Sequence, residues 1–269
     1  MLHTDQHETN QAEGNANAQS SSLSPEIQRL FDRMLAAPAV QRGLTFLTAD
    51  QEQRLAEQQA LTEIPAPPFQ EDARAEEYAR RMRELGLQHV HRDDEGNVIG
   101  YWKGTGERPL LVVSAHLDTV FPPGYAPAVT VDANGILHAP GISDNGSGLA
   151  ALLALIRALR ASEVQPIGDI MFVGDVGEEG RGDLRGIKYL FSQVNEIDGF
   201  ISIDGTGADT IVYQGLGSKR FEFGFHGPGG HSYQAFGCVP SPIHALGRAI
   251  QKIADLHVPL TPKTTFTVS

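Results

Sequence analysis

PLLVVSAHLD, residues 109–118, is the stretch that decides the fold: a short apolar run, expected to form a strand that ends at Ser114, and then a histidine at 116 and an aspartate at 118. Short continuous apolar runs are typical of strands that are buried on both faces of a parallel sheet. Two more follow, DIMFV at 169–173 and GFISI at 199–203, and helices are expected over 146–160 and 186–194. This alternation of strands and helices predicts an α/β fold, with a mostly parallel sheet and helices on both faces.

The residues before this run predict helices and a hairpin. Pro25 favours the start of an amphipathic helix, and helical patterns continue over 39–61 and 71–85. Strands are expected at 88–92 and 98–102, because they flank DDEGN, which is a typical turn sequence. A hairpin therefore precedes the buried strands.

The two ends of the sequence differ from this middle part. Residues 1–24 are polar and rich in Gln, Asn and Ser, so we expect a disordered tail. The α/β domain is expected over 25–217. At 218–269 the pattern changes to an alternating strand (219–226), a Gly-rich turn and a helix, as at the start of a smaller α+β domain. Both domains are expected to be incomplete.

Composition excludes several classes of protein. Lys and Arg total 21 against 33 Asp and Glu, so the net charge of −12 disfavours binding to nucleic acid or to anionic membranes. The single cysteine, Cys238, excludes an intrachain disulfide and a Cys-rich metal site, and we expect it to be inert. Without a secretory signal pattern or a bilayer-length apolar segment, the sequence favours a cytoplasmic protein.

Polar side chains gather where the predicted strands end. Parallel strands place their carboxyl ends at one edge of a sheet, and ligands bind there. Any of these residues alone could be a helix cap or an ordinary core residue. Together their carboxylates would repel one another unless a cation relieved them, and His with carboxylates suits zinc, cobalt or manganese. The sequence therefore predicts a metal site that draws on His116, Asp118, Asp144, Glu178, Glu179 and Asp204.

The spacing within two of these motifs suggests a division of work. Asp118 lies two residues after His116 on the same face of an extended segment, so its carboxylate can accept the other imidazole N–H. Of the adjacent Glu178 and Glu179, one can bind a metal while the other accepts a proton from water.

The segments HLD, SDNGSG, GEEG, SIDGTG and GPGGHS, in this order, resemble the M20 family of zinc-dependent exopeptidases and deacylases. That family includes carboxypeptidase G2-like enzymes, acetylornithine deacetylase, succinyl-diaminopimelate desuccinylase and peptidase T. The resemblance runs from about Ile64 to the end of the chain. It implies a zinc exopeptidase-like catalytic domain over 25–217 and the first part of a lid and dimerisation domain over 218–269.

The same resemblance implies the activity and the metal ligands. It indicates hydrolysis of an amide bond in a small peptide or N-acyl amino acid, with two divalent ions (zinc, or cobalt or manganese) in a homodimer. His116 and Asp204 resemble ligands of one ion, and Asp144 resembles the carboxylate that bridges both. The peptide bond from Asp144 to Asn145 is typically cis in the family. Glu179 resembles a ligand of the second ion.

Three more residues take roles through the resemblance. Glu178 resembles the general base, and Asp118 the residue that orients the histidine ligand. His231, in GPGGHS, resembles a lid histidine that reaches the oxyanion of the substrate, although by itself it could be an ordinary turn histidine.

One ligand of the family pattern is absent from this sequence. The family carries a last histidine in a segment that returns to the catalytic domain, whereas these residues end at Ser269 inside the second domain. We therefore expect the second ion to bind weakly and the chain alone to be impaired. Two alternatives stay open: a non-catalytic protein that binds metal or peptide, and a metallophosphoesterase, which the lack of Arg or Lys beside the Gly-rich loop disfavours.

Overall fold

The computed structural model describes residues 23–125, 127–205 and 209–269. The chain divides into two compact units, Met1–Ala208 and Asp209–Ser269, and each is described here by itself. The tail expected over 1–24 lies almost wholly outside the described residues. Its last residue, Ser24, caps the first helix, because its hydroxyl accepts a hydrogen bond from Ile27 N at 3.3 Å.

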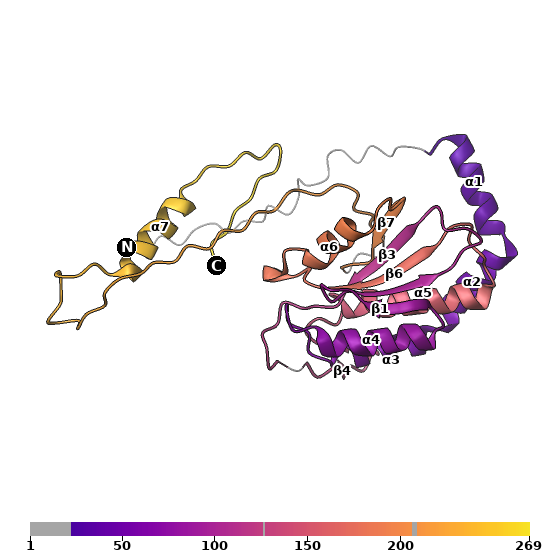
Figure 1. Cartoon of the computed structure of the whole chain (residues 1–269), viewed down its shortest axis with the longest axis horizontal. Helices are drawn as coiled ribbons and strands as arrows, with labels where there is room; N and C mark the ends of the chain where they lie inside the picture. Colours follow the sequence, from indigo (N-terminus) through magenta and orange to yellow (C-terminus); the bar gives the residue numbers. More distant parts are fainter. Residues whose placement is uncertain (1–22, 126, 206–208) are drawn as a thin grey trace. The chain divides into compact units, whose positions relative to one another are not determined.

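The first unit is built on a five-stranded sheet in the order β1-β2-β6-β3-β7 (Figure 1). Three neighbouring strands are parallel: β3 (Leu111–His116), β6 (Ile170–Asp175) and β7 (Gly199–Ser202). The hairpin of β1 (Gln88–Arg92) and β2 (Val98–Trp102) joins β6 in antiparallel register. The predicted α/β class and the hairpin are thus confirmed, with a mixed sheet in which β6, β3 and the edge strand β7 are parallel.

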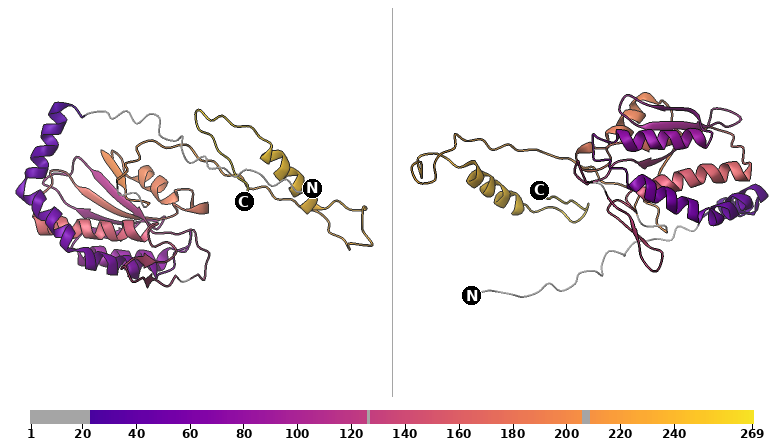
Figure 2. Two further views of the ribbon diagram at one scale, coloured as in Figure 1. Left: turned by 180° about the vertical axis from the view of Figure 1, so that it is seen from behind. Right: turned by 90° about the horizontal axis from the view of Figure 1, so that it is seen from below.

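Helices cover both faces of this sheet, as Figure 2 shows from two further sides. One face carries α4 and α5, with α2 and α3 packed against α5 and α1 against α2, and the other face carries α6. No helix among the described residues is both long and apolar enough to cross a bilayer. The bounds are α1 Pro25–Ala36, α2 Pro38–Ala49, α3 Gln51–Thr62, α4 Asp72–Glu84, α5 Gly146–Ser162 and α6 Arg185–Gln193, with a 3₁₀ turn at Gly180–Gly182 and a two-stranded ribbon of β4 (Thr130–Val131) and β5 (Leu137–His138).

The core follows the alternation of side chains along the strands. Val113 and Phe172 point to the α4 and α5 side, whereas their neighbours Val112 and Met171 point to α6. The largest buried side chains of α5 pack against the first face, and each contributes about 1.5–3 kcal/mol on burial: Leu149, Leu152, Leu153 and Ile156. The sheet is therefore covered on both faces around β3 and β6, which fixes the ends of these strands.

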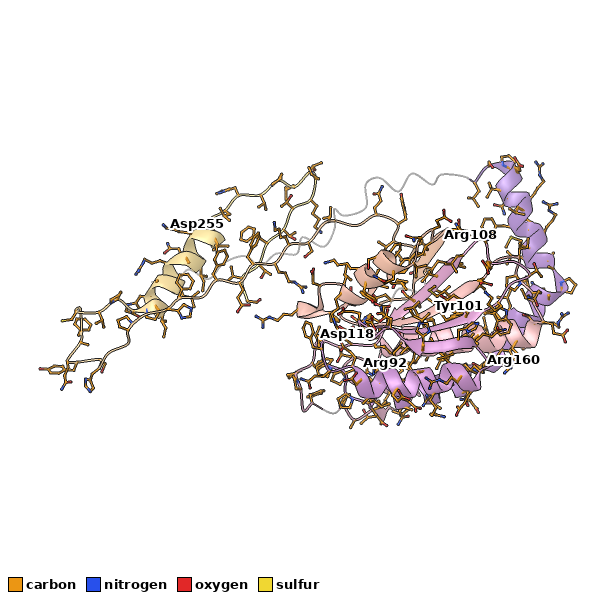
Figure 3. All side chains as sticks on the ribbon, in the orientation of Figure 1. Arg92, Tyr101, Arg108, Asp118, Arg160 and Asp255 are labelled. Atoms are coloured by element: carbon orange, nitrogen blue, oxygen red, sulfur yellow. The ribbon has the colours of Figure 1, made fainter. Side chains whose placement is uncertain are left out.

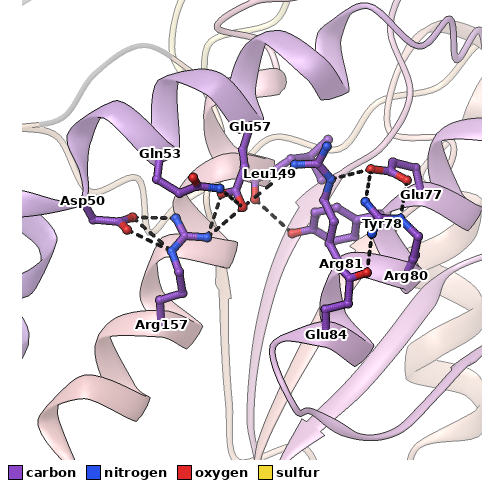
Figure 4. A network of polar contacts seen from close by, with 10 residues as sticks. All are labelled: Asp50, Gln53, Glu57, Glu77, Tyr78, Arg80, Arg81, Glu84, Leu149 and Arg157. Carbon is purple, nitrogen blue, oxygen red and sulfur yellow. Dashed lines mark hydrogen bonds and ion pairs between the residues drawn. The ribbon is translucent and has the colours of Figure 1, made fainter.

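The helix predicted over 39–61 is in fact two helices, α2 and α3, which meet at Asp50. At this break the Asp50 carboxylate accepts hydrogen bonds from Nε and Nη2 of Arg157 on α5, and the same guanidinium binds Glu57 on α3 at 2.8 Å (Figure 4). The helical layer is thus joined by a buried charged network whose partners lie far apart in the sequence.

The second unit, residues 209–269, carries one regular element, α7 (Pro242–Ala254). Ser241 caps it by accepting a hydrogen bond from His244 N at 3.3 Å, and Pro242 occupies the first turn, as expected for the helix predicted at 241–256. The strand predicted over 219–226 is wrong: these residues have no strand pairing in the described part of the chain. An alternating pattern forms a strand only when a partner accepts its backbone hydrogen bonds.

Candidate metal centre

The candidate site lies at the carboxyl ends of the three parallel strands. His116 is the last residue of β3 and pairs with Asp175 of β6, so this strand continues two residues beyond its predicted end at Ser114. Beyond β7, Ile203 N donates to Ser114 O at 2.8 Å and brings Asp204 beside β3. The sheet pairing therefore carries the histidine and the following aspartate to one edge.

His116 is at the centre of the site and is almost fully buried, with 1% of its surface exposed. Its Nε2 lies 2.9 Å from Asp144 Oδ1 and 3.5 Å from Asp204 Oδ1. On the other side of the ring, Nδ1 lies 3.0 Å from the backbone carbonyl oxygen of Asp118. One imidazole nitrogen thus faces two carboxylates from different loops.

Two sets of side chains could each hold an ion. His116, Asp144 and Glu179 offer ligand atoms that all lie within 4.8 Å of one another, and so do His116, Glu178 and Asp204. The histidine is buried, the glutamates are half-buried and the aspartates are exposed. The structure thus brings together the residues that the sequence analysis placed at the strand ends, and the two sets share His116.

Asp118 is fully buried. Its carboxylate was expected to accept the second imidazole N–H of His116, but its main contacts are different. Its carboxylate is 3.6 Å from His116 Nδ1, while its backbone carbonyl is the closer partner of the ring. The carboxylate oxygens accept the backbone N–H groups of Glu178 at 3.1 Å and Glu179 at 2.9 Å. Asp118 therefore links the end of β3 to the two glutamates as well as to the histidine.

Asn145 holds two of the acidic loops together. The peptide bond between Asp144 and Asn145 is cis, as the family resemblance implied. Asn145 Oδ1 accepts Gly148 N at 3.0 Å and so caps α5, while its Nδ2 donates to Ile203 O at 2.9 Å. A side chain at Gly148 would collide with Asn145 and with the Ile203 carbonyl. The close approach of α5 to the end of β7 therefore requires glycine at that position.

The electrostatics of this site favour positive charge. Burial by itself lowers the pKa of His116, but its contacts with the carboxylates of Asp118 and Asp204 outweigh burial and raise this pKa to about 11. The hydrogen bond to His116 in turn lowers the pKa of Asp204. A site that binds a proton this strongly has the negative charge and the donor set that suit a divalent ion, so its residues fit a metal.

The two glutamates are also perturbed. Burial raises the pKa of Glu178, and the charges of Asp204, Asp118 and Asp144 act in the same direction. Burial likewise raises the pKa of Glu179, with the charges of Asp144 and Glu178 adding to it. A carboxylate whose affinity for a proton is raised is better suited to accept one from water.

Asn97 was missed by the sequence analysis as a support of this site, since it was assigned only to the hairpin turn. It is fully buried, its Oδ1 accepts Val176 N at 3.1 Å, and its Nδ2 donates to Gly186 O at 2.9 Å. These contacts close the loop that carries both glutamates. Its partners are distant in the sequence, so no local pattern could indicate this role, whereas Asn145 before GSG could have been found as a helix cap.

His231 belongs to the second unit, where it is exposed. Its Nδ1 accepts the N–H groups of Tyr233 at 3.3 Å and Gln234 at 3.4 Å, which are contacts within its own turn. Cys238 is an exposed free thiol. The expected contact of His231 with a substrate stays a prediction.

Comparisons with known proteins agree with this fold. Residues 97–220 match the model of Peptidase family M28. Succinyl-diaminopimelate desuccinylase of Coxiella burnetii is 28% identical over 189 residues, which are 65% of this chain and 50% of that enzyme. The chain spans half or less of the length of the curated relatives that it matches.

Two solved structures show the same architecture. A tripeptidase from Staphylococcus aureus superposes with a TM-score of 0.50 at 28% identity, over 58% of this chain and 44% of that one. The di-peptidase Dug1p from Saccharomyces cerevisiae gives a TM-score of 0.60 over 78% of this chain and 52% of that one; at 15% identity it is similar in fold. The fold and these matches fit the M28/M20 class of zinc peptidases. The proteins to which this chain is similar are peptidases or amidohydrolases, which is the kind of enzyme that the family resemblance implied.

Proposed function

We propose that this protein is a metal-dependent hydrolase that cleaves an amide bond in a small peptide or an N-acyl amino acid. The observation that carries the proposal is the pair of potential ligand sets that share His116, with Glu178 at the same edge of the sheet. The similarity to a tripeptidase and to a desuccinylase supports both substrate classes. Peptides and acyl amino acids share the amide bond that such a site would attack.

Two divalent ions, zinc or else cobalt or manganese, are part of this proposal. His116, Asp204 and Asp144 would hold one ion, and Asp144 and Glu179 would hold the other, with fewer side chains from this chain. When bound, such ions lower the pKa of a water molecule and polarise the scissile carbonyl. The ligand types present, one imidazole and several carboxylates, suit these metals.

Glu178 is the proposed general base. Its raised pKa and its place among the side chains around His116, where it belongs to one of the two potential ligand sets, would allow it to take a proton from water and pass it to the leaving amine. Asp118 fixes the backbone of Glu178 and faces the imidazole of His116, so it orients both residues. His231 is proposed to donate a hydrogen bond to the substrate oxyanion.

The alternative of a non-catalytic metal or peptide binder is less favoured, because a binder gains nothing from a glutamate of raised pKa beside its ligands. A homodimer, as the family resemblance implies, and a cytoplasmic location complete the proposal.

The test is hydrolysis of a panel of dipeptides, tripeptides and N-acyl amino acids by the protein after incubation with Zn²⁺, Co²⁺ or Mn²⁺. We expect release of free amine that stops when a chelator is added and returns with excess metal. His116→Ala should abolish it. Hydrolysis that is indifferent to the chelator, or a protein that binds none of these metals, would refute the proposal.

A further inference from the structure

Arg74 on α4 is a buried arginine, with 1% of its surface exposed. Its hydrogen bonds go to backbone carbonyls: Nη1 donates to Leu117 O at 2.7 Å, Nε to Ile64 O at 2.9 Å, and Nη2 to Thr62 O at 3.2 Å. A planar guanidinium presents its donors as a rigid fan, so one side chain joins three backbone positions. Arg74 thus connects α4 and the segment after α3 to the end of β3.

The carbonyl that receives Nη1 is placed between two site residues. Leu117 lies between His116 and Asp118, and its own N–H donates to Asp175 O at 2.7 Å. On the far side of Asp118, Thr119 N donates to Ala66 O at 2.9 Å. The backbone on both sides of Asp118 is therefore fixed, and Arg74 holds one of these two points.

Stability alone gives little reason for a charge at this position. Burial lowers the pKa of Arg74 to about 10, against the opposing charge of Asp118, so the group stays protonated at neutral pH. Burying a guanidinium carries a large desolvation penalty, and apolar residues of similar size are often as stabilising in such places. A buried cation that binds the backbone beside proposed metal ligands indicates a role in that site.

We propose that Arg74 is a positioning residue of the metal centre. It holds the Leu117–Asp118 peptide, and Asp118 in turn contacts the ring of His116 and the backbone of Glu178 and Glu179. This inference rests on the proposed function, because it assumes that the acidic edge binds cations.

Positioning and simple electrostatics predict opposite effects on metal affinity. A fixed positive charge near a cation site repels the cation, so removing Arg74 would tighten metal binding if charge alone mattered. If Arg74 orients the ligands, its removal weakens binding, by about 10–100-fold as for other groups that orient metal ligands. The sign of the change therefore separates the two explanations.

The experiment is titration with Co²⁺, whose visible absorption reports both affinity and ligand geometry, of the wild-type chain, Arg74→Met and Arg74→Lys. Circular dichroism establishes that each variant is folded at the temperature used. We expect weaker binding and a changed spectrum in both variants. Arg74→Lys keeps the charge but cannot reach the same three carbonyls, and it replaces Arg74→Met if that variant does not fold.

Arg157→Met is the matched control. Arg157 is also a largely buried arginine, but it lies roughly 16 Å along α5 from Gly146, by the rise of an α-helix, and it binds Asp50 and Glu57. Its removal should leave Co²⁺ affinity and the spectrum unchanged in the folded protein. If Arg74→Met and Arg157→Met lowered the Co²⁺ affinity equally, the cause would be a general loosening of the fold, and positioning by Arg74 would be refuted.

The outcomes keep this inference separate from the proposed function. If the wild-type chain shows no Co²⁺ binding that depends on His116, the proposed function fails and the inference fails with it. If the wild type binds Co²⁺ and the folded Arg74 variants bind it equally well or more tightly, the proposed function stands and the positioning role is wrong.

Discussion

The two ends of the central sheet both carry carboxylates, but they neutralise them differently. At the amino ends, Asp169 before β6 accepts hydrogen bonds from Lys103 and from Gly104 N, the latter at 2.9 Å. Asp198 before β7 binds Arg108 at 2.8 Å and Leu110 N at 2.6 Å. Figure 3 labels Arg108 and Asp118, which lie just before and just after β3, at these two ends.

At the carboxyl ends of the strands, carboxylates outnumber the cationic side chains that contact them. Asp144, Asp204 and the two glutamates surround a single imidazole, that of His116, and Arg74 gives its hydrogen bonds to carbonyl oxygens instead. In the helical layer, by contrast, Arg157 neutralises both Asp50 and Glu57. Where carboxylates serve stability, the chain supplies the cation itself. Where it leaves them in excess, at the candidate metal centre, we propose that a divalent cation from outside neutralises them.

The largest expected effect is on catalysis at the carboxyl ends. Glu178→Gln removes the proposed base but keeps its size, so turnover should fall by about 10²–10⁴-fold while metal binding is retained. Steady-state kinetics and metal analysis measure both quantities. Glu77→Gln, in an ion-paired carboxylate of α4, is the control and should leave turnover unchanged. Equal turnover in wild type and Glu178→Gln would show that the carboxylates at the carboxyl ends of the strands have no catalytic role that sets them apart from those at the amino ends.

Next in size is the loss of the ion pairs in the helical layer. Arg157→Met leaves the largely buried Asp50 unpaired and leaves Glu57 with only the longer contact to Arg81 at 3.9 Å, which should lower the free energy of unfolding by about 3–5 kcal/mol. Urea denaturation at neutral pH measures the loss. Replacing Asp50 and Glu57 with leucine in the same variant should recover much of it; a triple variant as unstable as the single one would contradict this explanation.

A smaller effect, which depends on pH, is expected at the amino ends. Burial would raise the pKa of Asp169, but its hydrogen bonds to Lys103 and Gly104 N outweigh burial and lower it. Because the folded-state pKa is lowered, this carboxylate stabilises the fold above its ordinary pKa of 3.8, and the stabilisation is lost as the pH falls through the folded value. Asp169→Asn should therefore cost about 1–2 kcal/mol at pH 7 and progressively less below about pH 4.

Urea unfolding of wild type and Asp169→Asn at several pH values gives this difference directly. Glu163→Gln, a change at an exposed carboxylate, serves as the reference for general charge effects. A difference that stays constant down to pH 3 would show that the charge of Asp169 is not what stabilises this end.

The smallest effect is expected for a pair that is open to solvent. Arg108 contacts Glu196 at 3.0 Å and Asp198 at 2.8 Å, and nearly half of its side chain is exposed. Arg108→Ala should lower stability by less than about 1 kcal/mol, and the loss should disappear in about 1 M salt, where such charges are screened. Thermal unfolding with and without salt measures this, and a larger loss that is insensitive to salt would place Arg108 among the buried pairs.

The sequence predicted well those features that depend on neighbouring residues. The hairpin at 88–102 and the amphipathic or apolar helices are set by turn residues, proline and periodicity, all of which are local. The break at Asp50 was missed, because it accompanies a contact with Arg157 on another helix. The strand at 219–226 was predicted wrongly, because alternation indicates a strand only if a partner is present.

The same division applies to the candidate site. Strand ends followed by His116, Glu178 and Asp204 can be found in the sequence, because parallel strands end at one edge. Arg74 and Asn97 could not be found this way. An arginine on a charged helix and an asparagine in a turn are ordinarily exposed. Only the tertiary structure shows that both side chains are buried and form hydrogen bonds with backbone groups that are distant in the sequence.

The hydrogen bonds from the Glu178 and Glu179 amides to the Asp118 carboxylate matter for protein engineering. The spacing between the two glutamates and the histidine is set from β3, and Asn97 holds the start of α6 independently. A new loop grafted between these two anchors would therefore have to keep both sets of contacts, together with the hydrogen bond from Gly182 N to Glu179 O at 2.8 Å.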